Sequence, residues 1–200
     1  MAGLGLTPTD AVVGRLLQYI ALLGKWNRAY NLTAIRDPYA MITRHLLDSL
    51  AVIPYIEGPH LVDVGTGPGL PGIPLALMCP DLDWVLLDSN GKKTRFVTQA
   101  VAELGLDNVR VKTGRVAETS LEPRCNTVIS RAFSDLVAFI EGAGHLCRED
   151  GQLLAMKAAA AADELQQLPL AYNAQQIPLQ IPGLDAQRCI IRIVRKQTVA

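Results

Sequence analysis

Apolar residues recur every three to four positions early in the chain, which is typical of helices packed on one face. From Thr7-Pro8 onward the apolar face carries Val12, Val13, Leu16, Leu17, Ile20 and Leu23. Asp37-Pro38 opens a second helical stretch that ends before Pro54. This pattern predicts an N-terminal helical extension over residues 1–58.

After the extension the pattern changes to short apolar runs separated by helical stretches. We expect strands near Leu61 to Val64, Val85 to Asp88, Val109 to Thr113, Val128 to Ser130, Leu153 to Lys157 and Ile190 to Arg195. The clearest helix between them is Lys92 to Leu104, and the alanine run 158–162 also indicates helix. The alternation predicts an α/β fold, a doubly wound and mainly parallel sheet in a domain over residues 59–200.

The first predicted strand leads into the most distinctive segment, Leu61-Val62-Asp63-Val64-Gly65-Thr66-Gly67-Pro68-Gly69-Leu70-Pro71-Gly72. Glycines such as Gly65 and Gly67 permit positive φ angles and close approach of a ligand to the backbone. A helix that starts near Gly72 presents unpaired amide donors to the same space. The segment therefore predicts a site for a small ligand.

Charge and spacing narrow the choice of ligand. Counted from Gly67, the dinucleotide pattern Gly-x-Gly-x-x-Gly is met, but with prolines at Pro68 and Pro71, which lack amide donors. Asp63 at the strand end opposes a pyrophosphate and suits ammonium and sulfonium charges, which favours S-adenosylmethionine. Asp88, at the end of the second strand, suits the ribose hydroxyls of either cofactor. A nicotinamide-dependent oxidoreductase therefore stays open as an alternative.

Composition limits the possible partners. The 200 residues carry 19 Lys and Arg against 19 Asp and Glu, so no overall field attracts nucleic acid and a polyanion site must be a local basic patch. The three histidines have no partner at metal-ligand spacing, and we expect no metal. No charge-poor stretch of membrane-span length is free of proline or glycine. We expect a soluble cytoplasmic protein that does not contact a membrane.

Several motifs together resemble the bacterial RsmG (GidB) family, and the similarity spans most of the chain. The segments are Trp26-Asn27-Arg28-Ala29-Tyr30-Asn31-Leu32-Thr33, Arg44-His45-Leu46-Leu47-Asp48-Ser49, Val64 to Leu75, Leu87-Asp88-Ser89 and Ile129-Ser130-Arg131-Ala132-Phe133. The resemblance implies a class I, Rossmann-like methyltransferase that uses S-adenosylmethionine. It further implies methylation of N7 of a guanine, nucleotide 527, in 16S ribosomal RNA, with the RNA or the small ribosomal subunit as partner.

The same resemblance places cofactor contacts on Gly65, Leu70, Val116-Ala117 and Arg131. From their charge and their place in the loop, we expect Asp63, Gly67 and Asp88 to bind the cofactor as well. The family pattern usually has acids where Ala117 and Asn126 stand here, so we expect Ala117 to contribute only its backbone.

No general base is assigned, because guanine N7 carries an exposed lone pair and loses no proton before attack. Ser130-Arg131-Ala132-Phe133 follows the fourth strand and lacks the Asn/Asp-Pro-Pro-aromatic motif of amino methyltransferases. Besides the methyltransferase and the oxidoreductase, a non-catalytic module that binds S-adenosylmethionine remains a third alternative.

Basic side chains near the predicted site are candidates for RNA phosphates. They are Arg36, Arg44, His45, Lys92, Lys93, Arg95 and Arg131. A hydrogen-bonded structural role is the alternative for His45, and a solvated helix face is the alternative for the lysines. The sequence leaves the oligomeric state open.

Overall fold

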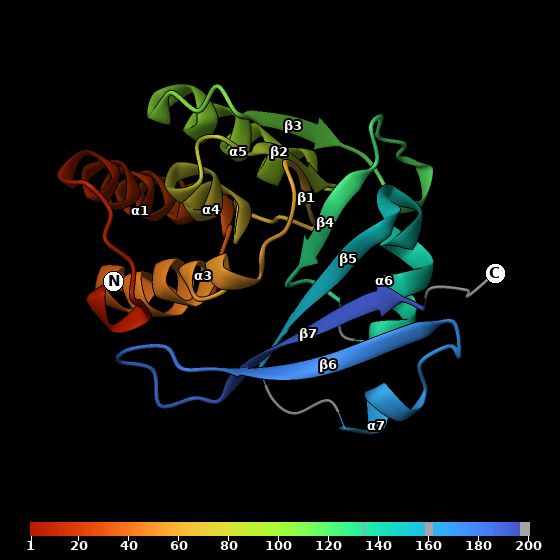
Figure 1. Ribbon diagram of the computed structural model, residues 1–200. Helices are drawn as coiled ribbons and strands as arrows, with labels where there is room; N and C mark the ends of the chain where they lie inside the picture. The colour runs from red at the N-terminus through yellow and green to blue at the C-terminus, as the bar shows by residue number, and fades with distance from the viewer. Residues whose placement is uncertain (134, 159–161, 197–200) are drawn as a thin grey trace.

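The computed structural model describes residues 1–133, 135–158 and 162–196, and the core is a single seven-stranded sheet (Figure 1). The strand order is β3-β2-β1-β4-β5-β7-β6. The strands are β1 (His60–Val64), β2 (Asp83–Asp88), β3 (Val109–Thr113), β4 (Cys125–Ser130), β5 (Cys147–Lys157), β6 (Tyr172–Leu179) and β7 (Arg188–Arg195). Strands β1 to β5 are parallel to one another, and β7 runs antiparallel to both of its neighbours. The predicted doubly wound, mainly parallel α/β fold is confirmed.

The central strands are apolar without interruption because helices cover both faces of the sheet. In β2 every residue after Asp83 is buried, and in β1 every residue after His60 is buried. Six strands appear where the sequence predicted them. The remaining strand, β6, was not predicted, because it is a partly exposed edge strand that contains Pro178 and several polar residues.

Helices lie on both sides of the sheet (Figure 1). On one side are α1 (Asp10–Tyr30), α4 (Gly72–Met78) and α5 (Gly91–Leu104); on the other are α6 (Leu136–Ala143), the 3-10 turn η5 (Gly144–Leu146) and α7 (Ala162–Gln166). Three further 3-10 turns are η1 (Ala2–Leu4), η3 (Ile53–Tyr55) and η4 (Val116–Glu118). The predicted alanine helix 158–162 falls largely outside the described residues.

The N-terminal helix is part of the main core. Leu16, Tyr19 and Leu23 of α1 are fully buried, and the ring centroid of Tyr19 lies 6.4 Å from that of Phe96 on α5. Because α1 buries its apolar face against α4 and α5, residues 1–58 complete the helical layer on that side of the sheet. Within the described residues no helix is long and apolar enough to cross a membrane.

The second predicted helix is divided by a π-helical turn. It starts at α2 (Pro38–Met41), where the Asp37 carboxylate accepts a hydrogen bond from the Ala40 amide at 2.7 Å. The π-helical turn η2 (Ile42–Leu47) follows, and then α3 (Asp48–Leu50). Such turns are frequent at functional sites. Here the turn is followed at once by a buried acid, Asp48, at the carboxyl edge of the sheet.

Candidate active site

The loop after β1 brings its backbone close to the ends of two other strands. Gly65 and Gly67 have φ angles of +69° and +59°, which only glycine adopts without strain. The Gly65 amide donates to the Leu87 carbonyl at 2.8 Å. A Cβ on Gly65 would lie 2.6 Å from the Cβ of Ala132. Close packing and a positive φ angle therefore both favour glycine at position 65, whereas at position 67 the φ angle alone does so.

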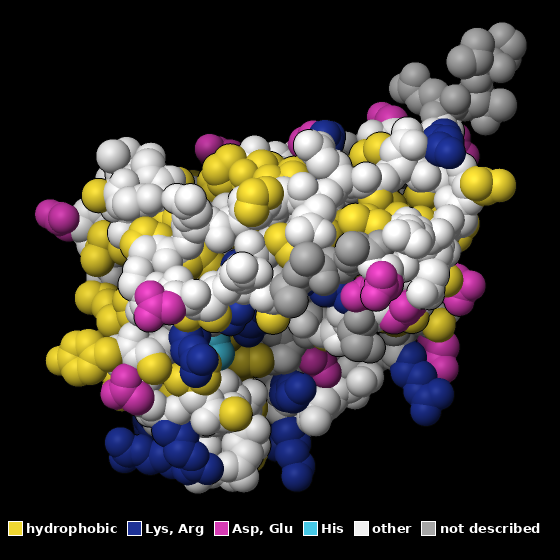
Figure 2. Space-filling model, turned by 90° about the horizontal axis from the view of Figure 1, so that it is seen from below, with side chains coloured by type: hydrophobic (Ala, Val, Ile, Leu, Met, Phe, Trp, Pro, Cys, Tyr) yellow, Lys and Arg dark blue, Asp and Glu magenta, His cyan; other side chains and the backbone are white. Residues whose placement is uncertain are grey.

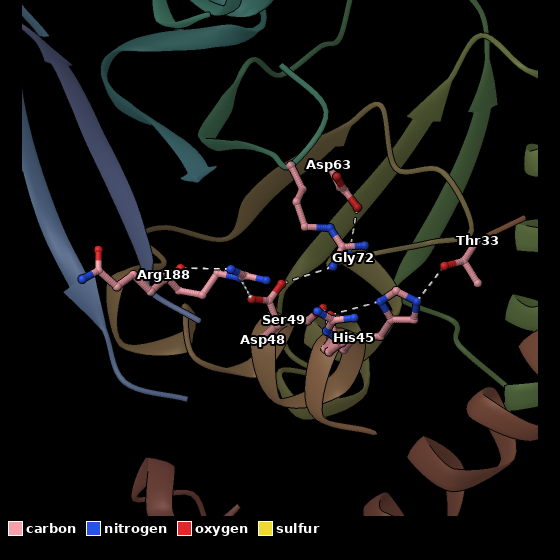
Figure 3. Close-up of polar contacts among 10 residues, drawn as sticks. Thr33, His45, Asp48, Ser49, Asp63, Gly72 and Arg188 are labelled. Atoms are coloured by element: carbon pink, nitrogen blue, oxygen red, sulfur yellow. Dashed lines mark hydrogen bonds and ion pairs between the residues drawn. The ribbon is translucent and has the colours of Figure 1, made fainter. Parts of the chain in front are cut away.

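Asp63 shapes this loop from beneath. Its side chain is fully buried, and Oδ2 accepts a hydrogen bond from the Thr66 hydroxyl at 2.6 Å. The same oxygen accepts one from the Gly72 amide at 2.9 Å (Figure 3). Oδ1 has no hydrogen-bond donor among the described residues. Burial raises the pKa of Asp63 to about 6, against the opposing effects of these hydrogen bonds and of the Arg131 charge.

Asp88 holds the same loop from the end of β2. Its Oδ2 accepts from the Gly67 amide and its Oδ1 from the Asn90 amide, both at 2.8 Å. The carboxylate is almost completely buried yet lines a cavity. Two backbone amides thus orient an acceptor that retains further lone pairs for a ligand.

The first cavity lies at the carboxyl ends of β1 to β4 and has a volume of about 410 Å³. It is lined by Val64, Gly65, Leu87, Asp88, Ser89, Lys93, Gly114, Arg115, Val116, Ala132 and Phe133. A cavity of this size is typical of small-ligand sites, and we call it the cofactor cavity. It includes Gly65, Asp88 and Val116 of the predicted contacts, and also Lys93, which was predicted as an RNA contact.

The other predicted cofactor contacts lie around this cavity. Gly67 and Leu70 are buried in the loop, and Asp63 lies beneath it. Ala117 is exposed in η4, next to Val116. Arg131 lines a different cavity from Ala132, its neighbour in the chain. Their contact with the cofactor remains a prediction.

The second cavity, which we call the arginine cavity, has a volume of about 290 Å³. It is lined by Ile35, Arg44, His45, Asp48, Arg131, Met156, Lys157, Ala158, Leu179, Arg188 and Cys189. Lys and Arg side chains gather around a hollow on the face seen in Figure 2. Arg131 lines this cavity, whereas Ala132 and Phe133 line the cofactor cavity, so the segment after β4 separates the two.

A buried carboxylate joins two of these arginines. Asp48 Oδ2 lies 3.2 Å from Arg131 Nη1, and Asp48 Oδ1 lies 3.1 Å from Arg188 Nε (Figure 3). Arg188, which lies 140 positions from Asp48, was not predicted from the sequence. The only sequence signal was Asp48 itself, an acid in an otherwise apolar stretch next to Leu47 and Leu50.

His45 is enclosed beside this cluster. Its ring nitrogens lie 2.9 Å from the Thr33 hydroxyl and 3.1 Å from the Arg44 carbonyl oxygen. Burial, followed by the positive charge of Arg131, lowers the pKa of His45 to about 4. The ring is therefore neutral at pH 7 and its polar atoms are occupied. This geometry argues against the predicted phosphate contact and supports the structural alternative for His45.

The remaining candidates for RNA contact lie on the surface in separate groups. Arg44 is exposed at the arginine cavity, and Lys92 and Arg95 are exposed at the start of α5. Arg36 is also exposed and donates to the Asn31 side chain at 3.2 Å. Their contacts with RNA remain predictions.

The sequence matches the family model described as rRNA small subunit methyltransferase G, GidB, over residues 13–191. The chain belongs to this family. It is 50% identical over 196 residues to the ribosomal RNA small subunit methyltransferase G of Hydrogenovibrio crunogenus, covering 98% of this chain and 91% of the relative. Identity to the protein of the same name from Neisseria meningitidis is 48%, covering 98% of this chain and 95% of the relative.

Solved methyltransferase structures share the fold of this GidB-family chain. An S-adenosylmethionine-dependent methyltransferase from Aquifex aeolicus aligns with a TM-score of 0.60 at 16% identity, covering 79% of this chain and 94% of the other. A putative O-methyltransferase from Klebsiella pneumoniae aligns with a TM-score of 0.61 at 13% identity, covering 96% of this chain and 93% of the other. The class I methyltransferase fold is therefore confirmed.

The cofactor cavity fits S-adenosylmethionine, the cofactor of this family. Its apolar walls include Leu87, Val116 and Phe133, which suit a purine. Asp88 is oriented as an acceptor for hydroxyl groups. The unpartnered Oδ1 of Asp63 adds a buried negative atom beneath the loop, in keeping with a positively charged donor.

Proposed function

We propose that this chain transfers a methyl group from S-adenosylmethionine to N7 of a guanine in 16S ribosomal RNA, at nucleotide 527, in the cytoplasm. The observation that carries the proposal is the pair of cavities on either side of the segment after β4. One fits an adenosine-bearing donor, and the other presents arginines suited to a nucleotide.

For the donor, we assign the ribose hydroxyls to Asp88 and the base to the apolar wall around Val116. We place the positive charges of the donor near Asp63, whose Oδ1 has no hydrogen-bond partner among the described residues. When bound, S-adenosylmethionine supplies an electrophilic methyl group on a sulfonium. The chain itself orients the two reactants and excludes water from between them.

Guanine N7 attacks through an exposed lone pair, so the chain needs no residue to remove a proton. Orientation then carries most of the rate increase, and it contributes on the order of 7 to 11 kcal/mol in well-oriented intramolecular reactions. Arg131 and Ala132 suit this role because these neighbouring residues, just after the end of β4, border the two different cavities.

Local charge supports RNA as the partner. The chain has no net charge, so attraction of a polyanion must come from patches such as Arg44 and Arg131 at the arginine cavity and Lys92 and Arg95 on α5. A metal is not part of the proposal. Among the described residues no cluster of His, Cys, Asp or Glu has the arrangement of a metal site.

The deciding experiment incubates the purified protein with tritiated S-adenosylmethionine and small subunits, or 16S rRNA, from cells that lack the protein. We expect tritium in the RNA, and mass spectrometry should identify 7-methylguanine at one position. Binding of S-adenosylmethionine without transfer to either substrate would favour the non-catalytic module. Binding of NAD in its place would favour the oxidoreductase.

A further inference from the structure

The arginine cavity contains a three-residue ion cluster built from three distant parts of the chain. Arg131 follows β4, and Arg188 begins β7, which is antiparallel to β5 and therefore starts at the sheet edge where β4 and β5 end. Asp48 lies between them, with its side chain 5% exposed. One carboxylate compensates only one of two guanidinium charges, so the cluster retains a net positive charge.

Both arginines keep donors for a ligand. A guanidinium has five N–H groups; Arg131 uses Nη1 for Asp48, while Arg188 uses Nε for Asp48 and Nη1 for the Gln187 carbonyl. In the described ranges the other N–H groups of these two side chains have no hydrogen-bond acceptor. Both side chains line the cavity and are about a quarter exposed, so a ligand can reach them.

We propose that Arg188 and Arg131 together bind the phosphate group of the RNA nucleotide that receives the methyl group, with Asp48 as the residue that positions both. This inference rests on the proposed function. A phosphate matches two convergent guanidinium groups in charge and geometry. The apolar walls beside them, Ile35, Met156 and Leu179 among others, accommodate a ribose or base in the same cavity.

The geometry favours a phosphate as the ligand of the two arginines over two other groups, the edge of the guanine base and the cofactor carboxylate. The usual arginine contact with guanine is bidentate to O6 and N7, and it would occupy the lone pair that must accept the methyl group. The cofactor carboxylate is the second candidate, and the family resemblance predicts a cofactor contact for Arg131. Arg131 and Arg188, however, both line the arginine cavity and not the cofactor cavity, which lies on the far side of the segment after β4.

The test compares the full-length variants Arg188→Ala and Arg188→Lys with a matched control, Arg195→Ala. Arg195 ends the same strand and lies over the Tyr172 ring at 6.0 Å, away from the cavity. Three quantities are measured: the KM and kcat for methylation of small subunits, the Kd for RNA between 50 and 200 mM salt, and the calorimetric Kd for S-adenosylhomocysteine.

For Arg188→Ala we expect RNA Kd and KM to rise about tenfold, with the S-adenosylhomocysteine Kd changed less than about twofold. The slope of log K against log salt should fall by about 0.7 to 0.9, the loss of one phosphate contact. Arg188→Lys should recover part of the affinity because it retains the charge, and its thermal unfolding reports whether the ion cluster still forms. Arg195→Ala should behave as wild type.

Two outcomes overturn the inference. Unchanged RNA affinity and salt slope in a folded Arg188→Ala protein would remove the phosphate contact. A weakened Kd for S-adenosylhomocysteine with unchanged RNA binding would assign the arginines to the cofactor carboxylate. Failure of the proposed function is a separate result, because the wild-type protein itself would then transfer no methyl group to ribosomal RNA.

Discussion

The two cavities on either side of the segment after β4 are built in different ways. The cofactor cavity is formed by short segments that directly follow consecutive strands, such as Gly65 after β1 and Val116 after β3. In the arginine cavity, Asp48 pairs with Arg131 and Arg188 across 83 and 140 positions. A cavity made from strand-end loops leaves local motifs in the sequence, whereas one made from distant single residues does not.

The largest effect should come from removing the carboxylate at the centre of the arginine cavity. We expect Asp48→Ala to lower the free energy of unfolding by about 3 kcal/mol, the lower end of the range for broken buried ion pairs, because Arg131 and Arg188 are partly exposed. Urea unfolding followed by circular dichroism measures this change.

Asp150→Ala is the matched control, since it breaks an exposed pair with Arg148 and should leave stability unchanged within error. Equal effects in the two variants would show that the cluster around Asp48 is no more than a surface ion pair.

His45, in the arginine cavity, should make the stability of the protein depend on pH. Its pKa is about 4 in the folded protein and 6.5 in the unfolded chain. The unfolded chain therefore binds the proton more tightly, and this group costs stability as pH falls through 6.5 towards 4. Relative to His45→Gln, wild type should lose about 2 kcal/mol between roughly pH 8 and pH 5.

The measurement is the difference in unfolding free energy between the two proteins at each pH. Taking the difference removes the effect of Asp63, which titrates in the same pH range. Its pKa is raised from 3.8 to about 6, so its contribution to the free energy of unfolding is lost as pH rises through that value. The two groups therefore offset each other in wild type. A difference that does not vary with pH would contradict a neutral, buried His45.

In the cofactor cavity we expect the next largest effect, on the affinity for S-adenosylmethionine, from a substitution in the loop after β1. Gly65→Ala places a Cβ at positive φ and 2.6 Å from Ala132, so we expect the affinity for S-adenosylmethionine to fall about tenfold. Gly14→Ala is the control, because a Cβ there meets no atom within 4 Å. Wild-type affinity in the Gly65 variant would mean that the loop shifts without affecting the cofactor.

The smallest effect should come from Asp63→Asn, which preserves an acceptor for Thr66 and Gly72 but removes the charge. We expect the affinity for S-adenosylmethionine to fall about fivefold, the loss of roughly 1 kcal/mol of attraction. Calorimetry with S-adenosylhomocysteine, which lacks the sulfonium charge, separates the two positive charges of the donor. If Asp63 attracts the sulfonium, the affinity for S-adenosylhomocysteine should not change. No change for either ligand would leave Asp63 with only its role in the loop.

Most of the sheet could be predicted because its central strands are buried on both faces and read as continuous apolar runs, as in Trp84 to Leu87. Strand β6 escaped prediction because its polar residues, Asn173 and Gln175 among them, carry no such run. The π-helical turn around His45 was not predicted because it spans only six residues, too few to show a change of helical period in the sequence.

The sequence by itself determined the cofactor loop, since the glycines, Asp63 and Asp88 stand in one strand-loop-helix-strand segment whose geometry follows from local backbone preferences. Only the tertiary structure decided the partnership of Asp48 with Arg131 and Arg188, and the neutral state of His45. Both depend on which strand ends meet at one edge of the sheet and on how completely water is excluded there. Those are properties of the packed chain rather than of any one segment.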